Sequence, residues 1–388
     1  MAKIGDVCAF KIDTLSAAYN GKIDYIDISA VDNREKKITQ TAIVLAKDAP
    51  SRAKQLVEHG DVIVSLVRPN LNAVAIIEEQ SQNLQVASTG YCVLRCNQMI
   101  YNRYLFYFCQ SETFVNSMTA QATGASYPAV SNSIVKNCEI PLPERNKQKE
   151  IADILDKVTS LIFLRKQQLA KLDELVKARF VEMFGDPADN VNNLPASPMT
   201  AICQIIDGDR GKNYPKQEEF SDSGFCLFLN AKNVTAQGFS FENCTYITEE
   251  KDALLRNGKL CRGDVVLTTR GTIGNLAFYD TSVPYENIRI NSGMVILRMN
   301  KQVVSEIFFI EQFKMQLDSI KSRIASGSAQ PQLPISTMNK IEMILPPIEL
   351  QNQFAAFVER VSQQKQTVQQ SLEKLKLMKK ALMQEYFG

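Results

Sequence analysis

The chain has 388 residues, of which 45% are hydrophobic, and its 44 basic and 42 acidic side chains leave a net charge of +2. Its length predicts two or three folded domains, and no apolar run approaches the ~20 residues that a membrane-spanning helix needs. Nine scattered cysteines without a secretory leader predict a reduced, cytoplasmic protein. The single histidine, His59, and the lack of any C-x-x-C pair argue against histidine catalysis and a zinc site.

Residues 1–143 predict a globular segment. Short β-rich runs occur at 62–67, 74–77 and 91–94, and an aromatic-rich helix is expected around 104–114. This segment carries 13 basic and 13 acidic side chains, so its overall charge does not attract a polyanion. If it contacts nucleic acid, a local patch must provide the contact.

Residues 144–185 predict one long helix. Apolar side chains alternate in steps of four and three for about four heptads, which is typical of a coiled coil. The seam consists of Ile151, Leu155, Val158, Ile162, Leu169, Leu172 and Val176, with Arg165 at one seam place. A linker is expected at 186–198, which is rich in proline and asparagine.

Residues 186–346 and 347–388 repeat this order. Short β-rich runs lie at 265–267, 276–279 and 294–297, and a helix is expected around 307–317. Pro346 and Pro347 then open a second long helix. Its seam consists of Phe354, Val358, Val361, Lys365, Val368, Leu372 and Leu375.

An internal duplication accounts for this order. Shifting the chain by 203 residues aligns 121–185 with 324–388 without a gap, and 19 of the 65 pairs are identical. The predicted fold is α+β, with two similar globular domains (1–143 and 186–346) joined by two long antiparallel coiled-coil helices (144–185 and 347–388) in pseudo-twofold symmetry. Two similar domains on one rod suit a target with two separated parts, such as duplex DNA with two half-sites.

Three sets of polar loops are candidates for DNA contact, because they combine cations, amides, hydroxyls or aromatic rings with glycine or proline. A solvated turn, a plain hairpin and a structural connection remain the simpler interpretations of the three. The candidate residues are Arg68, Asn70, Asn72, Ser126, Tyr127, Arg210, Lys212, Asn213, Tyr214, Lys216, Arg270, Thr272, Ser328 and Gln330.

Motifs for catalysis are missing from the sequence. It contains no Walker A motif, no G-x-G-x-x-G, no G-x-S-x-G and no Asn-Pro-Pro-aromatic run, and His59 is expected in a surface loop. A recognition role without catalysis, cofactor or metal is therefore favoured. A bivalent protein-binding adaptor without a DNA role is the alternative.

The whole chain resembles the specificity subunits of type I restriction–modification systems. The resemblance is carried by the strand at 263–267 with Thr269–Gly274, by the loop at 326–331, and by Leu345–Gln351 at the start of the last helix. In copy one, Ile140–Gln148 resembles the same helix start, whereas Arg68-Pro69-Asn70 replaces the Arg-Gly-Thr run.

The resemblance implies two target recognition domains, each binding one half of a split double-stranded DNA sequence. It also implies that the helices set the spacer and carry two modification (methyltransferase) subunits, which a restriction (motor–nuclease) subunit joins. S-adenosylmethionine and ATP are then expected on those partner subunits, with no cofactor in this chain.

Overall fold

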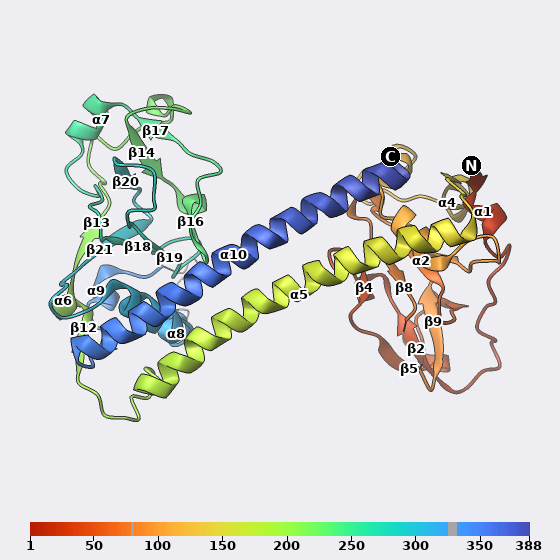
Figure 1. The fold of residues 1–388 in the computed structure, drawn as a ribbon, viewed down its shortest axis with the longest axis horizontal. Coiled ribbons are helices and arrows are strands. Elements are labelled where there is room, and N and C mark those ends of the chain that lie inside the picture. Colours follow the sequence, from red (N-terminus) through yellow and green to blue (C-terminus); the bar gives the residue numbers. More distant parts are fainter. Residues whose placement is uncertain (79–80, 325–331) are drawn as a thin grey trace. The chain divides into compact units, whose positions relative to one another are not determined.

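The computed structural model describes residues 1–78, 81–324 and 332–388, and these form two compact units. Unit 1 contains residues 1–167 and 369–388, and unit 2 contains residues 168–368. Two long helices, α5 (Arg145–Phe184) and α10 (Ile348–Phe387), each contribute one end to each unit (Figure 1). Unit 1 contains the start of α5 and the end of α10, and unit 2 the reverse, so the two helices run antiparallel.

Two sheets of three or more strands build the globular part of unit 1. A three-stranded antiparallel sheet has the order β10 (Tyr91–Leu94), β7 (Val62–Ser65), β8 (Val74–Ile76). A four-stranded sheet has the order β5 (Ala42–Leu45), β2 (Lys22–Ile26), β9 (Leu84–Ser88), β6 (Ala53–Leu56), in which β2 and β9 are parallel. The remaining elements are β1 (Ala2–Lys3), α1 (Ile4–Val7), η1 (Ile28–Ala30), β3 (Val31–Asp32), β4 (Lys37–Ile38), η2 (Ala46–Asp48), η3 (Pro69–Leu71), α2 (Asn102–Phe108), α3 (Glu112–Ala120), α4 (Asn132–Asn137) and β11 (Glu139–Ile140).

Unit 2 repeats the central strands of this topology, with one strand more in the first sheet and one fewer in the second. One antiparallel sheet has the order β13 (Cys203–Asp207), β21 (Met294–Met299), β18 (Val265–Thr268), β19 (Leu276–Phe278). The other has the order β17 (Tyr246–Ile247), β14 (Cys226–Leu229), β20 (Ile288–Ile290), again with one parallel pair, β14 and β20. The remaining elements are β12 (Ala196–Pro198), α6 (Met199–Ile202), η4 (Gln217–Glu219), η5 (Ala231–Asn233), β15 (Val234–Thr235), β16 (Gly238–Phe239), α7 (Glu249–Leu254), α8 (Glu306–Ile324), α9 (Ile335–Met338) and β22 (Glu342–Ile344).

The predicted fold class is confirmed, and the coiled-coil seam with it. Every seam residue named from the sequence is buried or half-buried in α5 and α10. The last turn of each helix is anchored by a fully buried phenylalanine, Phe184 in unit 2 and Phe387 in unit 1. Among the described helices, none is long and apolar enough to cross a membrane.

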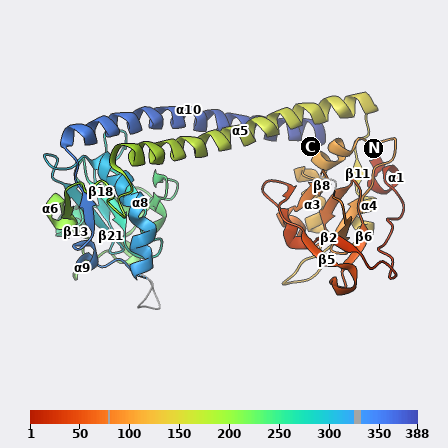
Figure 2. The same cartoon turned by 90° about the horizontal axis from the view of Figure 1, so that it is seen from below.

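Two local expectations were wrong. The helix expected around 104–114 is broken into α2 and α3, because the Ser111 side chain accepts the Phe114 N–H at 3.2 Å and starts a new helix. In unit 2 the matching helix α8 is continuous and lies beside the sheet that contains β18 and β21 (Figure 2). The end of the expected linker is strand β12, which pairs with β22.

The joint between each globular domain and its long helix is the same in both copies. Gln148 accepts the Tyr101 N–H at 2.8 Å and donates to Met99 O and Pro143 O. Gln351 likewise accepts the Ser305 N–H at 3.0 Å and donates to two carbonyls. Both glutamines are fully buried, so these bonds satisfy backbone groups that water cannot reach.

Candidate nucleic-acid interface

Two of the predicted loops meet at the turn between β7 and β8 in unit 1. The Arg68 N–H donates to Pro128 O at 2.7 Å, which ties the turn to the loop that follows α3. The Arg68 guanidinium lies 4.8 Å from the centre of the Tyr127 ring. Both side chains are exposed, Tyr127 to 69%. The turn therefore presents a cation and an aromatic ring to solvent side by side, next to the exposed Ser126.

The backbone of this turn is held in an unfavourable conformation. Arg68 and Asn72 both have φ 49°, in the left-handed region, where a non-glycine residue costs about 1–3 kcal/mol. The Asn72 side chain holds the turn closed, because its Nδ2 donates to Cys109 O at 2.7 Å and its Oδ1 accepts from Lys36 Nζ at 2.7 Å. Asn72 thus positions the turn, whereas Asn70 is exposed at its tip.

The equivalent turn of unit 2 lies between β18 and β19. The N–H groups of Thr269 and Arg270 both donate to Gly293 O, at 2.8 and 3.2 Å. The Leu333 N–H donates to Thr269 O at 2.9 Å, so the segment after α8 again lies against the turn. Arg270 and Thr272 are exposed, and between them Gly271 has φ 70°, which explains the glycine there.

A third predicted loop joins this turn in unit 2. The Arg210 Nη2 donates to Asp207 Oδ1 at 3.0 Å and to Ser292 O at 3.2 Å. Ser292 immediately precedes Gly293, the residue that holds the Arg270 turn. The structure therefore brings Arg210 and Arg270, which are 60 positions apart in the sequence, to the two sides of one tight turn.

Asp209 fixes the backbone of the Arg210 loop. Its Oδ1 accepts the Gly211 N–H at 2.7 Å and its Oδ2 accepts the Arg256 N–H at 2.8 Å. These N–H groups, that of Gly211 first, lower the pKa of the Asp209 carboxyl. The carboxylate is buried to 6% exposure and so acts inside the loop, not on a ligand.

A family model, the type I restriction modification DNA specificity domain, matches residues 1–174 and again 199–377. The chain belongs to this family. It is similar to the MjaVIII specificity subunit of Methanocaldococcus jannaschii, with 25% identity over 77% of this chain and 72% of that protein. It is also similar to the MjaIX specificity subunit of the same organism, with 22% identity over 93% of this chain and 82% of that protein.

Solved structures share the fold of this specificity-domain chain. A chain from a study of the assembly and conformational transition of the type I restriction–modification system superposes with a TM-score of 0.61 and 23% identity, covering 100% of this chain and 96% of that one. The type I S subunit from M. genitalium superposes with a TM-score of 0.58 and 16% identity, covering 100% and 95%.

The other predicted contact residues of the specificity-domain chain divide into three groups. Lys212 and Lys216 are exposed. Tyr214 instead packs edge-on against Phe228 at 5.7 Å, and Asn213 Nδ2 donates to Leu254 O at 3.1 Å, so both stabilise the domain. Ser328 and Gln330 lie outside the described residues.

Sequence reasoning missed one group of cations in unit 1. Lys36 and Lys379 line a common hollow, although one belongs to the segment before β4 and the other to α10. Lys379 could have been found by continuing the seam from Leu372 and Leu375, since the next seam position is 379. No three His, Cys, Asp or Glu side chains gather as a metal site would require in the part of the chain that the structure describes.

Proposed function

We propose that this chain is the DNA-recognition subunit of a type I restriction–modification complex, in which each unit recognises one half of a split DNA sequence. One observation carries the proposal. In both copies the same turn presents an exposed arginine, Arg68 or Arg270, held against the segment that follows α3 or α8. Two similar sites, one in each unit, match a target with two half-sites.

The chemistry of each site suits base edges and phosphates. A guanidinium donates two hydrogen bonds to guanine O6 and N7 in the major groove, whereas hydroxyls and backbone N–H groups bind phosphate oxygens. In unit 1 the exposed Tyr127 ring adds a stacking or packing surface beside Arg68. In unit 2 Arg210 adds a second guanidinium beside Arg270. The two units therefore recognise different half-sites.

The long helices serve in this proposal as spacer and as platform for partner subunits. Unit 2 has a groove between the end of α5 and the start of α10, with the half-exposed Leu175 and Phe357 in its lining. The equivalent positions in unit 1 are Met378 and Ile154, which are also exposed. Duplicated apolar surfaces suit two copies of one partner, here two modification subunits, which a restriction subunit joins. Methyl transfer from S-adenosylmethionine and ATP-driven steps then belong to those partners.

The arginine turns are tested by binding. Arg68→Ala and Arg270→Ala should each weaken binding to the cognate duplex by ~1–3 kcal/mol, since each removes a base or phosphate contact. Lys340→Ala is the matched control, because it removes an exposed cation from the α9–β22 connection of the same unit as Arg270. Competition titrations on cognate duplexes and on duplexes altered in one half-site measure the effect. If both arginine variants bind the duplexes with wild-type affinity, these turns are not part of the DNA interface.

The same titrations separate DNA recognition from a purely protein-binding adaptor. Phosphate contacts release counterions, so the affinity of a DNA-binding chain falls steeply as salt rises. An adaptor without a DNA role would show weak duplex binding with no dependence on the half-site sequence.

A further inference from the structure

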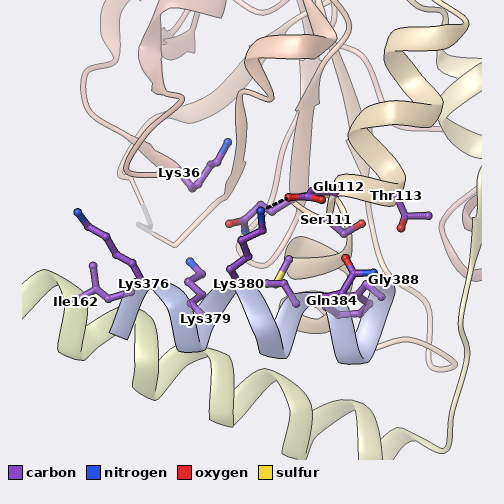
Figure 3. A pocket seen from close by; sticks show the side chains of 13 residues that line it. Lys36, Ser111, Glu112, Thr113, Ile162, Lys376, Lys379, Lys380, Gln384 and Gly388 are labelled. Atoms are coloured by element: carbon purple, nitrogen blue, oxygen red, sulfur yellow. Dashed lines mark ion pairs between the residues drawn. The ribbon is translucent and has the colours of Figure 1, made fainter. Parts of the chain in front are cut away.

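A lysine-rich hollow lies in unit 1 where the last turns of α10 meet the segment before β4 and the start of α3. It has a volume of about 290 Å³. Figure 3 shows Lys36 on one side of this space and Lys376, Lys379 and Lys380 rising from α10 on the other. A second hollow, of about 500 Å³, shares Lys36 and Lys379 with the first. It adds the cations Arg34, Lys37 and Lys166 and the carboxylates Glu35 and Glu78, of which Glu35 pairs with Lys166 at 2.7 Å.

Among the described residues the two central lysines form no ion pair. Carboxylates act on them only from further away, Asp32 on Lys36, and Asp156 and Glu35 on Lys379. Lys376 and Lys380 are ion-paired, with Glu373 at 2.9 Å and Glu112 at 3.2 Å. Within the described residues, neither Lys36 nor Lys379 has a carboxylate at ion-pair distance; Lys36 Nζ donates to the backbone and side-chain oxygens of Asn72. The hollow therefore has an excess of positive charge at its centre.

Burial makes this excess charge costly in the folded protein. Loss of water, and then the nearby charge of Lys379, lowers the pKa of Lys36 to about 8. Loss of water also lowers the pKa of Lys379. An anion in the hollow would restore a favourable environment for both ammonium groups.

The internal repeat shows that packing does not require these lysines. Lys379 occupies a seam position of α10, and its equivalent in α5 is Val176, which is buried to 7% exposure in unit 2. The equivalent of Lys376 is Asp173, which pairs with Lys365 at 2.6 Å. Unit 2 thus packs the equivalent helix end without a lysine at this seam position. In unit 1 the half-buried Lys379 has its Nζ 5.6 Å from the centre of the Tyr107 ring, a contact that does not neutralise its charge.

The hollow adjoins the Arg68 turn. Asn72, the residue that closes this turn, is the hydrogen-bond partner of Lys36, and η3 of the turn packs against α3, whose first residues line the hollow. We propose that the hollow binds backbone phosphates of the DNA duplex whose half-site unit 1 recognises. This inference rests on the proposed function and adds an anchor that does not depend on base sequence.

Salt titrations of the full chain test the anchor. A mixed-sequence duplex suffices, because phosphate contacts are independent of sequence. Between about 50 and 200 mM salt, Lys379→Val should reduce the slope of log affinity against log salt by about 1, and Lys379→Val with Lys376→Gln by about 2. Lys374→Gln is the control, since Lys374 is exposed on the same helix and outside the hollow. Lys379→Val copies the residue at the equivalent seam position, so we expect it to fold.

The outcomes distinguish this proposal from the function on which it rests. If Arg68→Ala weakens duplex binding while the lysine variants keep the wild-type slope, the anchor is refuted and DNA recognition stands. If the wild-type chain binds no duplex, DNA recognition itself fails. If inorganic phosphate stabilises the wild type against heat, and not the lysine variants, while their duplex binding is unchanged, the hollow binds a small anion and the proposal is overturned.

Discussion

At the scale of single residues, one ion pair is repeated in the two copies. Arg95 bonds to both carboxylate oxygens of Asp61 at 3.0 and 2.9 Å, and Arg298 bonds to Asp264 at 2.8 Å through two nitrogens. Both carboxylates are buried and lie just before β7 or β18. The ion pair is thus common to the two copies and lies at the strand ends opposite to the Arg68 and Arg270 turns, whose residues differ between the copies.

Asp209 allows a prediction with a defined pH dependence. Asp209→Ala removes the acceptors of the Gly211 and Arg256 N–H groups and should lower the free energy of unfolding by ~1–3 kcal/mol near neutral pH. Because the pKa of Asp209 is lowered in the folded state, this contribution is present above the ordinary value of 3.8 and is lost as pH falls below it. Denaturant titrations at several pH values measure the difference.

Asp222→Ala is the control for this prediction, since Asp222 is an exposed carboxylate of the same unit. It should leave stability unchanged. If Asp209→Ala lowered the free energy of unfolding as much at acid pH as at neutral pH, the charge of the carboxylate would not be what holds the loop.

At the scale of elements, the glutamine joints determine how the long helices start. Gln148 and Gln351 each bond the first turn of a long helix to the segment that leads into α2 or α8, with three hydrogen bonds in each joint. A helix attached by such bonds starts in a defined direction. The joint therefore links the orientation of a recognition domain to the helix that follows it.

Gln351→Leu tests this joint. It preserves the size of the side chain but leaves the Ser305 N–H and two carbonyls without partners, so the free energy of unfolding should fall by roughly 2–4 kcal/mol. Gln364→Leu is the control, because Gln364 is exposed on the same helix. Thermal and denaturant unfolding measure both variants. If Gln351→Leu and Gln364→Leu were equally stable, water would be bonding the Ser305 N–H and the two carbonyls in place of Gln351.

At the scale of the whole molecule, each unit has its own hydrophobic core. The largest core of unit 1 contains Phe387 from the end of α10, and the largest core of unit 2 contains Phe354 from its start. Since the cores are separate, one recognition domain can change without repacking the other.

Replacing residues 199–345 by the same region of a related specificity subunit should therefore change one half-site only. Methylation-sensitive sequencing of a host that carries the chimera, compared with the parent, measures both halves of the modified sequence. A host carrying the reciprocal exchange of the N-terminal domain is the control, and it should change the other half. A change in both halves from one exchange would show that the units do not recognise DNA independently.

The sequence by itself determined the duplication, the two long helices and the turns that carry Arg68 and Arg270. These features follow from local order, since a seven-residue period and a 203-residue repeat are present in the linear chain. The break between α2 and α3 was missed because one side-chain cap at Ser111 outweighs the helical pattern around it.

Only the tertiary structure decided which polar side chains face solvent and which cationic side chains lie close together. Tyr214 and Asn72 look like contact residues in the sequence, but their side chains are bound within the protein. Lys36 and Lys379 share a hollow although 343 positions separate them. Such proximity depends on how separate elements pack. Because α10 runs antiparallel to α5, its last turns pack against the first domain, and no local sequence pattern predicts this contact.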